Sequence, residues 1–164
     1  MAGLKLSYNT NAVQDQLFGN VQSQLKANLG LNVQLDPSDF PSLISKRNAK
    51  QAIMYRDSWG ADYDHPQDWF DNLFICAQAK PGGANSAGYC NPNVDKLSTQ
   101  AEQLPDVNKA IPMYEQALHL MVKDAYGAIL DYNTQPYLVQ SYVQGMGNNG
   151  LYDYYWAGIR ILKH

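Results

Sequence analysis

The amino-acid sequence predicts an α/β fold in which a mixed sheet is flanked by helices. Residues 4–8 and 31–35 each alternate apolar and polar side chains, as half-buried strands do. Between them, residues 12–29 repeat apolar side chains at intervals of three and four, which is typical of an amphipathic helix. A strand, a helix of this length and a second strand form a βαβ unit with parallel strands. The 164 residues suffice for one domain with a core.

Short polar segments mark the ends of these first elements. Residues 9–11 are expected to form a turn and helix cap, and Gly30 to end the helix at the left-handed C′ position. Ser38, in the turn that follows, is a candidate cap for a second helix reaching about Arg47. Residues 51–57 are more apolar and predict a third, more buried strand.

The rest of the chain predicts helices, one loop and several extended segments. Short helices are expected at 66–77 and 92–103, separated by a loop whose clearest turn is Pro81-Gly82-Gly83. Asp106 can cap a longer helix. Its predicted apolar stripe consists of Val107, Ile111, Tyr114, Leu118, Met121 and Ala125. A buried strand is expected at 128–130 and extended structure at 136–144 and 151–163.

Composition and charge argue against a nucleic-acid partner and against a membrane-spanning segment. The net charge is -3 with no basic run, so nucleic acid is not an expected partner, because phosphate binding needs clustered Lys and Arg. No apolar run approaches the length of a membrane span, about 18 residues. Residues 1–5 lack the charged and apolar regions of a signal peptide, and Met1 is compatible with a start codon added to a dissected fragment.

Cys76 and Cys90 flank a loop rich in Gly, Pro, Asn and Ala. A disulfide between them would close this loop and stabilise the fold by roughly 3 kcal/mol in the chain-entropy model. Such a bond would imply an oxidising compartment. The alternative is a pair of free thiols in a reducing compartment, and the number of cysteines does not separate the two.

Three collinear segments resemble the solute-binding proteins that serve peptide and nickel importers. Residues 22–33 (QSQLKANLGLNV) match a helix-to-strand stretch, and residues 56–63 (RDSWGADY), followed by Pro66, match a strand that leads into a turn. Residues 86–97 (SAGYCNPNVDKL) match a loop-to-helix signature. A long helix with YEQA at 114–117 and the final ILKH are also similar to oligopeptide-binding members.

This resemblance implies one lobe of a type II periplasmic-binding-protein-like fold. It covers about the last third of such a protein, with residues 1–139 as the ligand-binding lobe. Residues 140–164 would cross back to a first, N-terminal lobe whose sequence is missing here. The resemblance further implies a short-peptide ligand, an ABC-transporter permease as partner, no cofactor, no enzymatic activity, and a periplasmic or extracellular location.

Two charged residues carry the expected ligand contacts. By the resemblance, Asp62 would bind the ammonium of the peptide N-terminus, and a carboxylate at the carboxyl end of a strand suits that role. The alternative for Asp62 is a solvated Asx-turn. Arg56 would receive the C-terminal carboxylate in a bidentate pair. The alternative for Arg56 is an ion pair with Asp57 or Asp39.

Aromatic and amide side chains complete the expected site. Trp59 and Tyr63 would form walls against the ligand, with Trp59 also packing into the core. Tyr89 and Asn133 are further candidates for the cleft. The aspartates of residues 57–71 match no calcium-hand spacing and the histidines no zinc spacing, so no metal site is expected.

Two rival hypotheses remain open at this point. The same fold could take another cargo, such as an oligosaccharide, a nickel chelate or an opine. A lobe fragment could also lack independent binding, because a single lobe covers only one side of a ligand.

Overall fold

The computed structural model describes residues 3–132, 136–147, 151 and 155–163. The chain divides into two compact units, Met1–Ser58 and Trp59–His164. The predicted boundary between residues 139 and 140 stays a prediction.

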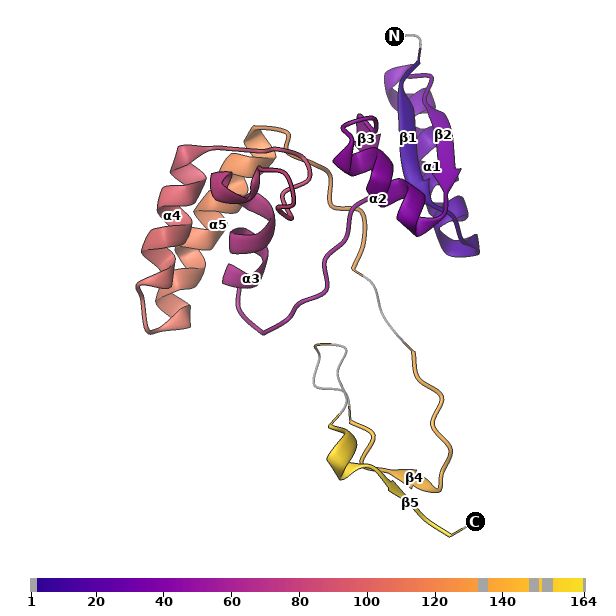
Figure 1. Ribbon diagram of the computed structural model, residues 1–164, viewed down its shortest axis with the longest axis vertical. Coiled ribbons are helices and arrows are strands. Elements are labelled where there is room, and N and C mark those ends of the chain that lie inside the picture. The colour runs from indigo at the N-terminus through magenta and orange to yellow at the C-terminus, as the bar shows by residue number, and fades with distance from the viewer. Residues whose placement is uncertain (1–2, 133–135, 148–150, 152–154, 164) are drawn as a thin grey trace. The chain divides into compact units, whose positions relative to one another are not determined.

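The first unit is a small parallel α/β layer (Figure 1). It contains β1 (Lys5–Asn9), α1 (Ala12–Leu29), β2 (Gln34–Ser38), α2 (Phe40–Asn48) and β3 (Met54–Tyr55). The strands pair in the order β2-β1-β3, and both pairs are parallel. The βαβ unit expected from residues 4–35 is therefore confirmed.

Polar and glycine residues set both ends of α1. The Asn11 side chain accepts hydrogen bonds from the backbone N–H groups of Val13 and Gln14, at 3.0 and 2.9 Å. These bonds satisfy donors that the first helical turn leaves unpaired. Gly30 ends the helix with φ 66°, a left-handed conformation that glycine adopts without strain. Both predicted helix ends are confirmed.

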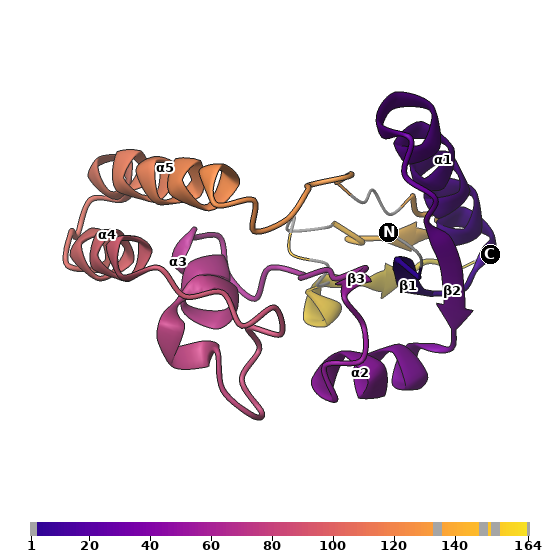
Figure 2. The same cartoon turned by 90° about the horizontal axis from the view of Figure 1, so that it is seen from above.

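The two helices of this unit cover opposite faces of β1, as alternation along a strand requires (Figure 2). Leu6 and Tyr8 point to one face and pack with Phe18 of α1. Ser7 points to the other face, where its hydroxyl donates to Asp36 at 2.8 Å. Lys46 of α2 donates to the same Asp36 oxygen, so α2 lies on the Ser7 side.

Three details of this unit differ from the sequence-based expectation. β2 begins at Gln34 and includes Pro37. A proline is tolerated in this strand because β2 lies at the edge of the sheet. Asp39 rather than Ser38 caps α2, because its carboxylate accepts from the Ser42 N–H at 2.8 Å. The third strand is only two residues long, and Ile53, expected to be buried, is 81% exposed.

The second unit begins with a helix that changes its hydrogen-bonding pattern. Where one helix over 66–77 was expected, three short elements occur: α3 (Gln67–Trp69), the π-helix η1 (Phe70–Phe74) and the 3-10 helix η2 (Cys76–Gln78). In η1 the Ile75 N–H donates to the Phe70 carbonyl, five residues earlier, at 3.1 Å.

The helices α4 (Pro92–Glu102) and α5 (Val107–Lys123) lie side by side and antiparallel (Figures 1 and 2). They form the core of the second unit. Asn91 and Asp106 cap the two helices. The expected stripe of α5 is correct at Tyr114 and Met121 and wrong elsewhere. The remaining buried positions are Ala110 and Ala117, because small side chains allow α5 to approach α4 closely.

The end of the chain forms a short hairpin. β4 (Val143–Gln144) pairs antiparallel with β5 (Arg160–Ile161), and the one-turn 3-10 helix η3 (Trp156–Gly158) precedes β5. The buried strand expected at 128–130 is wrong, because these residues form no strand and Ile129 is 67% exposed. Among the described helices, none combines the length and apolar character that a bilayer crossing needs.

Candidate functional site

The turn from Trp59 to Asp62 is held by one buried side chain, Asp68 at the start of the helical segment. Asp68 is completely buried. Its Oδ2 accepts from the Trp59 indole Nε1–H and from the Asp62 backbone N–H, both at 3.0 Å. The turn is therefore held by hydrogen bonds to the Asp68 carboxylate rather than by hydrogen bonds between its own residues.

Local hydrogen bonds also fix residues 65–72, the segment that contains Asp68. The Asp68 N–H donates to the His65 carbonyl at 3.1 Å, and the Gln67 N–H donates to His65 Nδ1 at 3.1 Å. Asn72 Nδ2 donates to the Asp68 carbonyl at 2.7 Å and to Asp68 Oδ1 at 3.2 Å. Because Asp68 is anchored on both sides, the position of its carboxylate is well defined.

The Asp62 side chain itself is exposed to solvent. No hydrogen bond from a described residue reaches its carboxylate, so the Asx-turn considered as its alternative role does not form. Residues 59–79 contain four aspartates and no Lys or Arg. The carboxylate therefore lies in a negative environment, which favours a cationic ligand group.

Tyr63 lies beside further carboxyl groups. Burial raises the pKa of Tyr63, and the charges of Asp68, Asp71 and Glu102 raise it further. Its phenol is therefore a neutral hydrogen-bond donor at physiological pH, and the residue is 42% exposed. Such a side chain can offer both a face and a donor to a ligand.

A pair of acidic side chains, Asp71 and Glu102, links η1 to α4. The buried Ser98 hydroxyl lies 3.5 Å from Asp71 Oδ1 and 3.3 Å from Glu102 Oε1. Desolvation raises the pKa of Glu102, and the hydrogen bond and repulsion with Asp71 add to this. Burial, followed by the charges of Glu102 and Asp71, raises the pKa of Tyr114 to about 12.

Arg56 belongs to the first unit, at the carboxyl end of β3. Its NH1 donates to the Asn9 side-chain oxygen at 3.1 Å, which ties the ends of β3 and β1 together. The acids considered as its ion-pair partners have other roles: Asp57 accepts from Arg47 at 2.7 Å, and Asp39 caps α2.

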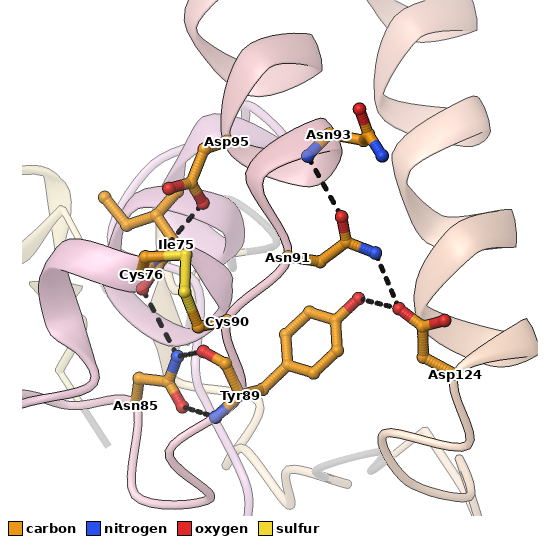
Figure 3. Close-up of a disulfide and its surroundings, with 9 residues drawn as sticks. All are labelled: Ile75, Cys76, Asn85, Tyr89, Cys90, Asn91, Asn93, Asp95 and Asp124. Atoms are coloured by element: carbon orange, nitrogen blue, oxygen red, sulfur yellow. Dashed lines mark hydrogen bonds between the residues drawn. A yellow bond between two sulfur atoms is a disulfide. The ribbon is translucent and has the colours of Figure 1, made fainter.

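The predicted disulfide between Cys76 and Cys90 is present, with Cα atoms 4.4 Å apart (Figure 3). Buried Asn85 organises the loop that it closes. Asn85 Nδ2 donates to the carbonyls of Tyr89 at 2.8 Å and Ile75 at 3.3 Å, and its Oδ1 accepts from the Tyr89 N–H at 3.1 Å. The loop is therefore shaped by a polar side chain as well as by the disulfide.

Tyr89, a predicted ligand residue, uses its hydroxyl within the fold (Figure 3). The hydroxyl donates to Asp124 Oδ2 at 2.7 Å, and Asn91 Nδ2 donates to the same oxygen at 2.7 Å. Burial and the bond to Asp124 raise the pKa of Tyr89 to about 12. What remains for a ligand is the exposed part of its ring.

The structure thus brings Trp59, Asp62 and Tyr63 together on one turn, while Tyr89 lies on the disulfide loop. Asn133 lies outside the described residues. Sequence reasoning missed Asp68, which it grouped with the other acids of this stretch. An acid at the start of a helix, six residues after Asp62, was the available signal. Among the described residues, no three His, Cys, Asp or Glu side chains are placed to hold a metal ion.

Comparison with known sequences finds oligopeptide-binding proteins. No protein-family model matches the chain. The periplasmic oligopeptide-binding protein OppA of Haemophilus influenzae is 29% identical over 161 residues, which cover 96% of this chain and 29% of that protein. The chain spans only 26–29% of the length of such curated OppA relatives.

Solved structures agree with the sequence comparison. The murein tripeptide binding protein MppA of Escherichia coli matches 98% of this chain and 31% of its own, with a TM-score of 0.85 and 27% identity. Haemophilus influenzae OppA in a complex with the peptide RPPGFSPFR matches the same shares, with a TM-score of 0.80 and 26% identity. The resemblance to peptide-binding solute-binding proteins, and the expected fold of one lobe, are confirmed.

Proposed function

We propose that this homologue of oligopeptide-binding proteins is a lobe of a solute-binding protein that binds short peptides for uptake by an ABC importer. The disulfide fits an oxidising compartment, and the relatives are periplasmic, so the proposed location is the cell envelope. The chain acts as a binding protein in this proposal and catalyses no reaction.

One observation carries the proposal: a solvent-exposed Asp62 carboxylate on a turn that a buried side chain fixes. A peptide N-terminus carries a primary ammonium, which offers three donors to such an acceptor. Because the turn is ordered before the ligand arrives, little conformational entropy is lost on binding. A charge-assisted bond of this kind contributes roughly 1.5–3 kcal/mol.

Other parts of the ligand would meet residues that differ in chemistry. Trp59 and Tyr63 would pack against the first side chain or peptide planes, and the ring of Tyr89 would extend this wall. Arg56 belongs to the first unit, and its role as partner of a carboxylate stays a prediction. In the full-length protein, the first, N-terminal lobe would close over the peptide, and the closed form would dock on the permease.

The test compares a tripeptide with its N-acetylated form. Isothermal titration of the chain should show tighter binding of the free tripeptide, by roughly 10- to 150-fold, if Asp62 contributes the bond described above. Asp62→Asn should remove this preference while the thermal midpoint stays unchanged. Asp64→Asn is the matched control, because it removes an equal charge from an exposed position two residues away.

Each other result has a distinct meaning. Equal binding of free and acetylated peptide would contradict the ammonium clamp, and binding of a cello-oligosaccharide in its place would favour the rival cargo. No binding of either would mean that this lobe is insufficient alone, and native mass spectrometry after addition of the first lobe would then show whether peptide is captured. Loss of folding in Asp62→Asn would make Asp62 a structural residue.

A further inference from the structure

Asp68 combines complete burial with bonds to the two most important positions of the turn. Its side chain is 0% exposed. Oδ2 accepts from the Trp59 indole and the Asp62 amide, and Oδ1 accepts from Asn72 Nδ2. A buried carboxyl group that only stabilised the helix start would bond to helix N–H groups, whereas these two donors belong to the ligand turn.

The donors around Asp68 fit its ionised form. All three neighbours on its oxygens present N–H groups, and a protonated carboxyl would need an acceptor for its own O–H. No ion pair of the described residues includes Asp68. Its negative charge is therefore solvated by fixed dipoles rather than cancelled by a cation, and its field extends toward the adjacent turn.

We propose that Asp68 is a positioning residue for the ligand's ammonium group. Its bonds fix the turn that presents Asp62, and its buried negative charge raises the affinity of that turn for a primary ammonium over a neutral group. This inference rests on the proposed function. It explains why a single exposed aspartate can select a cation: a second negative charge, buried from water, accepts a hydrogen bond from the backbone N–H of the same residue.

Two substitutions separate position from charge. Asp68→Asn keeps a carbonyl oxygen that can accept from Trp59 and Asp62, and it removes the charge. Asp68→Ala removes both. A purely structural role would make Asp68→Asn indistinguishable from the wild-type chain in ligand preference, and Asp68→Ala would then only lower stability.

The experiment has two readouts on the same samples. The first is the pair of ¹H–¹⁵N signals from the Trp59 indole and the Asp62 amide. Both should shift much further in Asp68→Ala than in Asp68→Asn, which keeps an acceptor for them. The second is the affinity ratio between a free and an N-acetylated tripeptide. This ratio should fall by about fivefold or more in Asp68→Asn, because the buried charge is lost.

The outcomes that overturn the inference differ from those that overturn the proposed function. Unchanged Trp59 and Asp62 signals in Asp68→Ala would refute the positioning role, and an unchanged affinity ratio in Asp68→Asn would refute the role of charge. If the wild-type chain itself does not distinguish the two peptides, the proposed function fails and the affinity part of this inference fails with it. The two NMR signals then still decide the positioning part.

Discussion

Replacing both Cys76 and Cys90 by Ser should lower the free energy of unfolding of the second unit by about 3 kcal/mol. The two cysteines are 14 positions apart, so the disulfide closes a loop of 15 residues. In the chain-entropy model, the cross-link removes about 10 cal/mol/K from the entropy of the unfolded chain for a loop of this length. Multiplied by 298 K, this gives the stated loss.

The structure explains why the folded state should survive the substitution. Asn85 holds the loop through its bonds to Ile75 and Tyr89, and Asp95 accepts from the Cys76 backbone N–H at 3.0 Å. None of these contacts uses a sulfur atom. The loss should therefore come from greater freedom of the unfolded chain rather than from a disturbed native loop.

Urea unfolding followed by tryptophan fluorescence measures this change. The midpoint should fall and the slope m should rise slightly, because an unfolded chain without the cross-link exposes more surface. Reduction of the wild-type protein with dithiothreitol is the control and should reproduce the double variant. A loss below about 1 kcal/mol would refute the loop-closure argument, and a loss well above about 5 kcal/mol would show that the Asn85 contacts cannot hold the loop alone.

Two further predictions concern single side chains. The pKa of Glu102 is raised, so the folded protein keeps the Glu102 carboxyl protonated to a higher pH than the unfolded chain does. The protonated carboxyl therefore contributes to the free energy of unfolding. This contribution is complete below the ordinary pKa of Glu and is lost as pH rises through the raised pKa. Denaturation at pH 5 and 7 should therefore show a fall in stability with pH that Glu102→Gln reduces; an identical pH dependence in the variant would contradict the shared environment with Asp71. Asn11→Ala should cost about 1 kcal/mol, since it removes the acceptor for two N–H groups of α1. Asn11→Asp, which keeps an acceptor, should restore most of this loss in thermal melts.

The limits of a helix could be predicted from the sequence where capping residues stand at its ends. The α1 helix has the predicted limits because an asparagine cap precedes it and Gly30 follows it. The helix expected at 92–103 is likewise correct to within one residue, since Asn91 supplies a side-chain cap before Pro92. Caps and terminators act within a few residues, so a sequence pattern contains all that they require.

Strand limits depended on partners that a local pattern does not contain. The alternating pattern at 31–35 predicted a strand there, yet pairing with β1 places Gln34 opposite Lys5 and extends β2 through Pro37. Ile53 and Ile129 have the apolar character of buried strands and are exposed. Apolar character favours burial, but a strand forms only where a neighbouring strand supplies hydrogen bonds.

The sequence predicts which residues of the candidate site would face the ligand, but it does not predict the buried Asp68 that holds them in place. Asp62 and Trp59 were recognised from their place after a strand and from the resemblance to peptide-binding relatives. The supporting bonds from Asp68 depend on how the chain reverses between residues 62 and 68. Among the acids of this stretch, only its place at the start of a helix sets the buried Asp68 apart.

The wide turn between Phe70 and Phe74 makes this segment sensitive to changes of length. Its hydrogen bond from Ile75 to Phe70 spans one residue more than an α-helical bond does. Deleting one residue would let the segment relax into a regular α-helix and would change which of its side chains face α4. Across a lineage, natural selection would thus remove insertions and deletions from these five residues.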